Sequence, residues 1–169
     1  MTRYFSYGSN MNQDNMDKFC DKRGRPRIDI STRNPRPAIL RDYRLEFNVW
    51  APSIQAGAGN IEPSKRDAVE GTVFDLSDED MITIDLKEGI PNVEKGKPDR
   101  YRRITVSLEL RDGSVLEDVV SYTANDFTKV AEFCPPSQGY KKDVVDGARA
   151  MGLSAAWVKM LEDLPTQDH

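Results

Sequence analysis

The chain has 169 residues, 38% of them hydrophobic and 31% charged, a composition typical of a folded globular protein rather than a disordered one. Its formal net charge of −4 disfavours general binding to a nucleic-acid backbone. We expect a single domain over residues 1–169, because no repeat, low-complexity tract or Gly/Ser-rich linker marks a second one.

The histidine and cysteine content narrows the chemistry. The only histidine is the last residue, His169, which excludes a Ser-His or Cys-His nucleophile and a zinc site built on imidazole. Cys20 and Cys134 have no CxxC spacing, so we expect no metal site. The remaining option is chemistry based on a carboxylate.

The compartment is indicated by the start of the chain and by its hydropathy. The first residues lack the basic and apolar blocks of a signal peptide, and no apolar segment reaches the length of a membrane span. We therefore predict a cytoplasmic protein with reduced thiols and no membrane partner.

The first element is a short apolar strand over residues 4–7 that enters the turn Gly8-Ser9-Asn10. A turn of this kind leaves backbone N–H groups without strand partners, and convergent N–H groups bind a carboxylate or a developing oxyanion. The alternative is an ordinary glycine turn in which Ser9 or Asn10 caps the next helix. That helix is predicted over residues 13–20, and we expect the basic cluster at residues 22–27 to be a solvated loop.

Strand patterns dominate the middle of the chain. A turn separates predicted strands at residues 36–40 and 43–50, another turn around Pro63 precedes a strand at residues 68–76, and Gly57 and Gly59 permit close approach of backbone or ligand or mark a loop. Residues 101–109 and 114–123 form a predicted hairpin with its turn at 111–113, and helices follow at 141–151 and 154–161. Because few helices separate these strands, we predict an α+β fold, a mostly antiparallel barrel with flanking helices.

One central helix, over residues 77–88, carries a second candidate feature. Ser77 is its predicted N-cap, acids fill its first turn, and Gly89 is placed to end it. Glu88 then lies at the C-terminus, where the helix dipole disfavours the charged carboxylate and raises its pKa, as proton transfer near neutral pH requires. The alternative is an exposed Glu before a glycine stop.

Three motifs in order resemble the gamma-glutamylcyclotransferase family, which includes AIG2-like barrels. They are Tyr7-Gly8-Ser9-Asn10, Asp85-Leu86-Lys87-Glu88-Gly89 and the later segment Pro135 to Lys142. The resemblance spans nearly the whole chain and implies a mixed, closed β-barrel. It also implies an enzyme that releases 5-oxoproline from a gamma-glutamyl amide with no cofactor.

The resemblance also assigns the site. Glu88 is implied as the general acid/base, and Tyr7, Gly8, Ser9 and Asn10 as the cradle of the gamma-glutamyl group. Two further tyrosines are carried over as substrate-binding residues, Tyr140 and, with less support, Tyr122. For both, structural packing is the alternative.

One segment departs from the family pattern. The stretch from residue 90 to residue 100 is longer than expected for the animal enzymes, and it could cover the pocket or shape the side of the leaving group. The sequence therefore does not determine the identity of the leaving amine or whether the protein forms a homodimer. A rival hypothesis is a small-molecule binding or interaction module that keeps the barrel without turnover.

Overall fold

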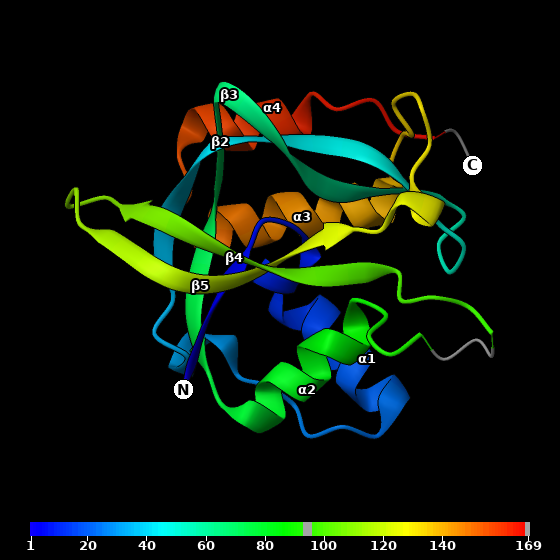
Figure 1. Ribbon diagram of the computed structural model, residues 1–169, viewed down its shortest axis with the longest axis horizontal. Coiled ribbons are helices and arrows are strands. Elements are labelled where there is room, and N and C mark those ends of the chain that lie inside the picture. Colours follow the sequence, from blue (N-terminus) through cyan, green and yellow to red (C-terminus); the bar gives the residue numbers. More distant parts are fainter. Residues whose placement is uncertain (93–95, 168–169) are drawn as a thin grey trace.

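The computed structural model describes residues 1–92 and 96–167 and shows a closed five-stranded barrel with helices around it (Figure 1). The strands follow one another around the barrel in the order β1-β3-β2-β4-β5. Their bounds are β1 (Thr2–Ser6), β2 (Arg36–Ala51), β3 (Ala56–Leu76), β4 (Tyr101–Leu110) and β5 (Val115–Ala124). The helices are α1 (Gln13–Arg23), α2 (Asp78–Lys87), α3 (Gln138–Ala150) and α4 (Ala155–Glu162).

The barrel closes through the first and last strands. β1 pairs antiparallel with β3 and parallel with β5, where Tyr4 lies opposite Val120. The remaining pairings are antiparallel. The predicted fold class, a small mixed and mostly antiparallel closed barrel with flanking helices, is therefore confirmed, as are the hairpin of β4 and β5 and the two helices of the tail.

The long strands β2 and β3 correct the sequence prediction. The turn expected between residues 40 and 43 is absent, because β2 continues through Asp42, which takes a positive φ of 62° at a register shift. The turn expected around Pro63 is also absent, since Pro63 pairs with Tyr43, and Arg66 takes a φ of 71° in the segment that follows. Bulges bend a strand while its pairing continues on both sides, so residues typical of turns stay inside one strand.

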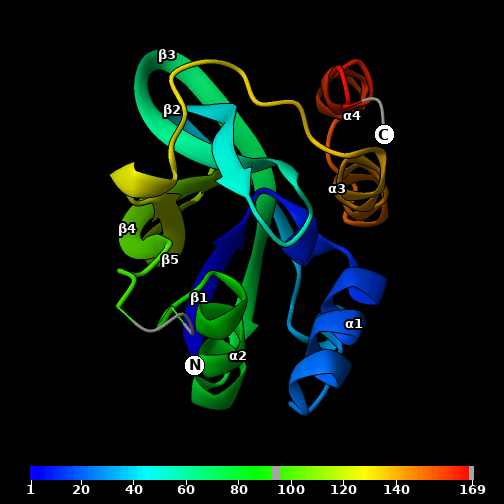
Figure 2. The same cartoon turned by 90° about the vertical axis from the view of Figure 1, so that its right-hand side faces the viewer.

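Two layers of helix flank the barrel. α1 and α2 lie beside each other at one end, and α3 and α4 pack together along another side (Figure 2). The interior of the barrel is filled by side chains of one apolar cluster: Phe5, Ala38, Leu40, Ile61, Val69, Val73, Val106, Leu108 and Val119. A separate cluster around Met11, Val145 and Leu161 joins α3 and α4 to the turn after β1.

The basic cluster at residues 22–27 is only partly the solvated loop that the sequence suggested. Lys22 and Arg23 form the last turn of α1, which ends at Gly24 with φ of 61°. Arg25 Nε donates to Thr83 Oγ1 at 3.1 Å and so ties the end of α1 to α2. The sequence prediction ended this helix at Cys20, whereas α1 continues to Arg23.

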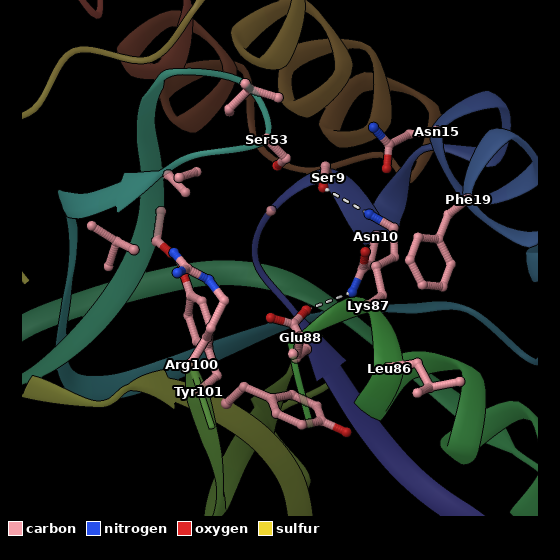
Figure 3. A pocket seen from close by; sticks show the side chains of 18 of the residues that line it. Ser9, Asn10, Asn15, Phe19, Ser53, Leu86, Lys87, Glu88, Arg100 and Tyr101 are labelled. Carbon is pink, nitrogen blue, oxygen red and sulfur yellow. Dashed lines mark hydrogen bonds between the residues drawn. The ribbon is translucent and has the colours of Figure 1, made fainter. Parts of the chain in front are cut away.

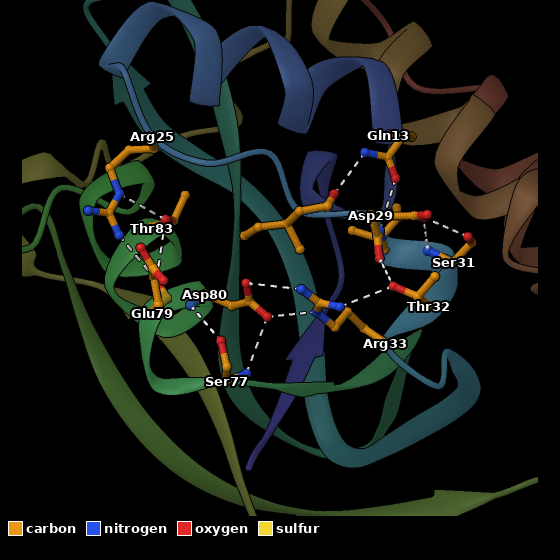
Figure 4. Close-up of polar contacts among 12 residues, drawn as sticks. Gln13, Arg25, Asp29, Ser31, Thr32, Arg33, Ser77, Glu79, Asp80 and Thr83 are labelled. Carbon is orange, nitrogen blue, oxygen red and sulfur yellow. Dashed lines mark hydrogen bonds and ion pairs between the residues drawn. The ribbon is translucent and has the colours of Figure 1, made fainter.

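The start of α2 is fixed by a polar network (Figure 4). Ser77 and Asp80 form a capping box, and Arg33 Nε donates to Asp80 Oδ2 at 2.7 Å. Burial acts to raise the pKa of Asp80, but the hydrogen bonds from Arg33 and Ser77 hold it below its usual value. The predicted N-cap is therefore confirmed, and the anchored start fixes the position of the other end, where Glu88 lies.

Candidate active site

The turn after β1 presents free backbone donors. Among the described residues, the N–H groups of Gly8, Ser9 and Asn10 donate no backbone hydrogen bond, whereas Met11 N–H closes the turn onto Gly8 C=O. Neither Ser9 nor Asn10 caps α1, because the side chain of Asn12 does so by accepting from Asn15 N–H. The turn is thus open for a ligand, as its anion-binding interpretation requires.

Glu88 lies against this turn. It follows the last residue of α2, and Gly89, with φ of 76°, ends the helix as predicted. The side-chain amide of Asn10 donates to Glu88 Oε1 at 2.9 Å (Figure 3). It also donates to the Tyr4 hydroxyl at 2.8 Å. Two motifs separated by 78 positions in sequence therefore meet in one site.

Burial raises the pKa of the Glu88 carboxyl above its ordinary value. The nearby Lys87 ammonium and the Asn10 hydrogen bond act in the opposite direction, and the charge of Asp85 adds to the rise. The expected direction is therefore found, with burial as its largest cause, whereas the sequence argument invoked the position at the end of the helix. A carboxyl of this kind gives up its proton at higher pH than an exposed Glu.

A cavity of about 430 Å³ opens over the carboxylate, large enough for a small-molecule ligand. All of the residues named from sequence line it: Tyr7, Gly8, Ser9, Asn10, Glu88, Tyr122 and Tyr140. Figure 3 shows Glu88 between Arg100 and Tyr101 on one side and the side chains of Ser9, Asn10 and Lys87 on the other.

The tyrosines differ in how their hydroxyls are used. Tyr7 OH donates to the backbone oxygen of Tyr122 at 2.8 Å, and Tyr122 OH donates to Asp85 Oδ1 at 2.6 Å. Each of these two hydroxyls therefore has a protein acceptor already. The Tyr140 hydroxyl instead accepts from Gly59 N–H at 3.3 Å, so its own proton is available to a ligand.

Two glycines near the start of β3, Gly57 and Gly59, allow this packing. A Cβ on Gly57 would lie 1.7 Å from the backbone oxygen of Cys134, so the close backbone approach suggested for that glycine is real. Gly59 C=O accepts from Tyr101 OH at 2.9 Å. The backbone N–H and C=O of Gly59 thus hold the hydroxyls of two pocket tyrosines, Tyr140 and Tyr101, in place.

Sequence reasoning did not assign other residues that line the pocket, among them Phe19, Lys87, Arg100 and Tyr101. Lys87 and Phe19 come from two helices, and no local pattern shows which face of each meets the other. Tyr101 begins a predicted strand and was not among the predicted substrate-binding residues. Of the unusual segment 90–100, Pro91, Asn92 and Arg100 line the pocket, and residues 93–95 lie outside the described part of the chain.

Among the described residues, no group of three or more His, Cys, Asp or Glu side chains is arranged to hold a metal ion. In the same part of the chain, no helix has the length and apolar character needed to cross a membrane.

The barrel, the open turn and the buried carboxylate define a class of protein. The family model of the AIG2-like family matches residues 68–161, more than half of the chain, and the chain belongs to this family. The match includes the helix that carries Glu88.

Curated relatives extend the likeness over nearly the full length. Human and bovine gamma-glutamylcyclotransferase are 27% and 26% identical, and each alignment covers 98% of this chain and 80% of the relative. A solved structure of a gamma-glutamyl cyclotransferase superposes with a TM-score of 0.75 at 24% identity, over 99% of this chain and 90% of the other. The chain is accordingly an enzyme of the gamma-glutamylcyclotransferase-like class.

Proposed function

We propose that this enzyme releases 5-oxoproline from a gamma-glutamyl amino acid or amine. In this reaction the α-amine of the substrate attacks its own γ-carbonyl carbon, a carbon–nitrogen bond closes the five-membered ring, and the original amide bond breaks. The proton lost by the attacking nitrogen goes to the leaving nitrogen, so no water is consumed. No protein nucleophile or cofactor is needed.

Glu88 is the general acid/base of this proposal. Its carboxylate takes a proton from the α-ammonium or amine and returns it to the leaving nitrogen. Burial supports this role, because a carboxyl with a raised pKa is closer to the pKa of the groups with which it exchanges protons. Asn10 fixes one carboxylate oxygen, which leaves the other free to face the substrate.

The open turn supplies the complementary donors. N–H groups of Gly8, Ser9 and Asn10 that have no backbone acceptor stabilise the tetrahedral oxyanion or hold the α-carboxylate. The Tyr140 hydroxyl adjoins them, since it would lie 3.4 Å from a Cβ on Gly8. Tyr7 and Tyr122 contribute pocket walls, because their hydroxyl protons are directed to protein oxygens.

Ring closure also benefits from confinement. An intramolecular attack needs the substrate held in one bent conformer, and well-oriented systems of this kind reach effective molarities of about 10⁵ M or more. A partly enclosed cavity lined by tyrosines, with one carboxylate and a set of free N–H groups, favours such a conformer. The non-catalytic alternative needs the donors but has no use for a buried carboxylate.

The 2.9 Å contact between Asn10 and Glu88 carries the proposal, since it places the base beside the donor turn. The test is release of 5-oxoproline from a panel of gamma-glutamyl dipeptides and amines by the wild type, Glu88→Gln and Glu79→Gln. Glu79 is exposed on the same helix and provides the matched control. We expect Glu88→Gln alone to abolish turnover while binding persists; full activity in Glu88→Gln would overturn the mechanism.

A further inference from the structure

The charges around the cavity are unbalanced. Among the described residues that line it, Lys22, Arg23, Lys87 and Arg100 are cationic, and Glu88 is the one carboxylate. The whole chain has the opposite balance, with a net charge of −4. A local excess of positive charge in an acidic protein indicates an anionic ligand.

Lys87 is the best placed of these cations. Its ammonium lies 3.4 Å from Ser9 Oγ and 5.7 Å from the centre of the Phe19 ring. Within the described residues it makes no ion pair, and burial lowers its pKa even though the charges of Glu88 and Asp143 favour the ammonium. The C-terminal end of α2 compensates for part of this charge, but a partly desolvated ammonium that makes no ion pair still gains from an arriving anion.

A second cation shares the same aromatic ring. The Arg23 guanidinium also lies 5.7 Å from the centre of Phe19, so α1 and α2 bring two positive groups to one ring at the cavity wall. Cation–π contact stabilises each group. An anionic group bound beside Phe19 would be attracted by both cations.

This cluster is distinct from Arg100, although its Lys87 ammonium is close enough to Glu88 to lower the pKa of that carboxyl. Figure 3 shows Lys87 and Phe19 on one side of Glu88 and Arg100 on the other. A gamma-glutamyl group brings one carboxylate, and the open turn already offers donors for it. The cluster beside Phe19 is therefore available to a different part of the substrate.

We propose that Phe19, Arg23 and Lys87 form a subsite for an anionic group on the leaving amine, so that acidic leaving amines are favoured over neutral ones. This inference rests on the proposed function and specifies its substrate class. It assigns to Lys87 a role in specificity that is distinct from the proton transfer at Glu88.

Three substrates of nearly equal size test the subsite. The leaving amines of gamma-glutamyl-glutamate, gamma-glutamyl-glutamine and gamma-glutamyl-glutaminamide carry two, one and no carboxylates. For the wild type we expect kcat/KM to rise with each carboxylate, by about tenfold or more across the series, as an ion pair at a partly buried site provides. Lys87→Met should remove most of this rise, and Arg23→Met part of it.

The control is Lys18→Met, which removes a positive charge from an exposed position of α1 outside the cavity lining. It should leave the charge preference intact, and thermal melting verifies that each variant folds. A wild-type kcat/KM that is flat across the series would overturn the subsite. So would a preference that survives Lys87→Met, and loss of the preference in Arg100→Met alone would place the anion on the other side of Glu88.

A calorimetric measurement separates this inference from the proposed function. Affinities of the same three compounds are measured on Glu88→Gln, and on Glu88→Gln combined with Lys87→Met. Charge-dependent affinity that is lost with Lys87 supports the subsite even if no 5-oxoproline is ever released. Equal affinities for all three compounds overturn the subsite even if turnover depends on Glu88.

Discussion

Removal of the Asn10 side chain by Asn10→Ala tests how the catalytic carboxylate is held. In the structure one amide nitrogen bridges Glu88 Oε1 at 2.9 Å and the Tyr4 hydroxyl at 2.8 Å. This hydrogen bond favours the ionised carboxylate and therefore lowers the pKa of Glu88 against the effect of burial. Without it the pKa of Glu88 moves further above its usual value.

The expected size of the effect on kcat/KM follows from the strength of a hydrogen bond to a charged group. A hydrogen bond to a charged group is worth about 1.5–3 kcal/mol, so at a pH on the acid limb kcat/KM should fall about 10- to 100-fold in Asn10→Ala. Because the base must be ionised before it accepts a proton, the acid limb of the profile should move to higher pH. Well above that limb, the loss should shrink to the part that comes from positioning alone.

The assay is initial-rate release of 5-oxoproline as a function of pH, with Tyr4→Phe as a graded companion. Tyr4→Phe removes the second acceptor of the Asn10 amide but leaves its bond to Glu88, so its effect should be smaller and in the same direction. An acid limb that stays in place in Asn10→Ala, or moves to lower pH, would refute the reasoning.

Three further outcomes are expected. Because the pKa of Glu88 is raised in the folded protein, the free energy of unfolding decreases as the pH rises through that pKa. The melting temperature of Glu88→Gln should therefore exceed that of the wild type at pH 8 but not at pH 4. The expected difference is about 2–4 °C for each kcal/mol by which the ionised Glu88 destabilises the wild type. Tyr140→Phe removes a hydroxyl facing the donor turn and should raise KM about 3- to 10-fold. It also leaves the Gly59 N–H without its acceptor, so we expect a loss of about 1 kcal/mol in urea unfolding; an unchanged KM would exclude contact with substrate. Gly71→Ala should cost about 3 kcal/mol in urea unfolding, because the new Cβ would lie 2.3 Å from the Ser6 backbone oxygen, and a loss below about 1 kcal/mol would contradict this.

Local signals made part of the fold predictable. The central helix begins and ends where Ser77 and Gly89 predict, because capping depends on residues within one turn. The hairpin of β4 and β5 was predictable for the same reason. The β2 and β3 strands were not, since Asp42 and Arg66 resemble turn residues locally and only the partner strand shows that they are bulges.

The candidate site was also predictable only where local sequence signals define it. Glu88 and the turn at Gly8 were found from sequence because each belongs to a recognisable motif. Their contact through Asn10 depends on how α2 packs against β1, which no short-range pattern contains. Lys87 was missed because a lysine in the last turn of a helix is ordinary, and its place above Phe19 becomes visible only when α1 and α2 lie together.

The central claim is that the substrate's own amine, rather than water, attacks the γ-carbonyl under the control of Glu88. The most direct test is turnover of the best gamma-glutamyl substrate in water enriched in ¹⁸O, with mass analysis of the product. We predict 5-oxoproline without ¹⁸O and one equivalent of free amine, both absent with Glu88→Gln. Release of glutamate that carries ¹⁸O would show hydrolysis and contradict the account.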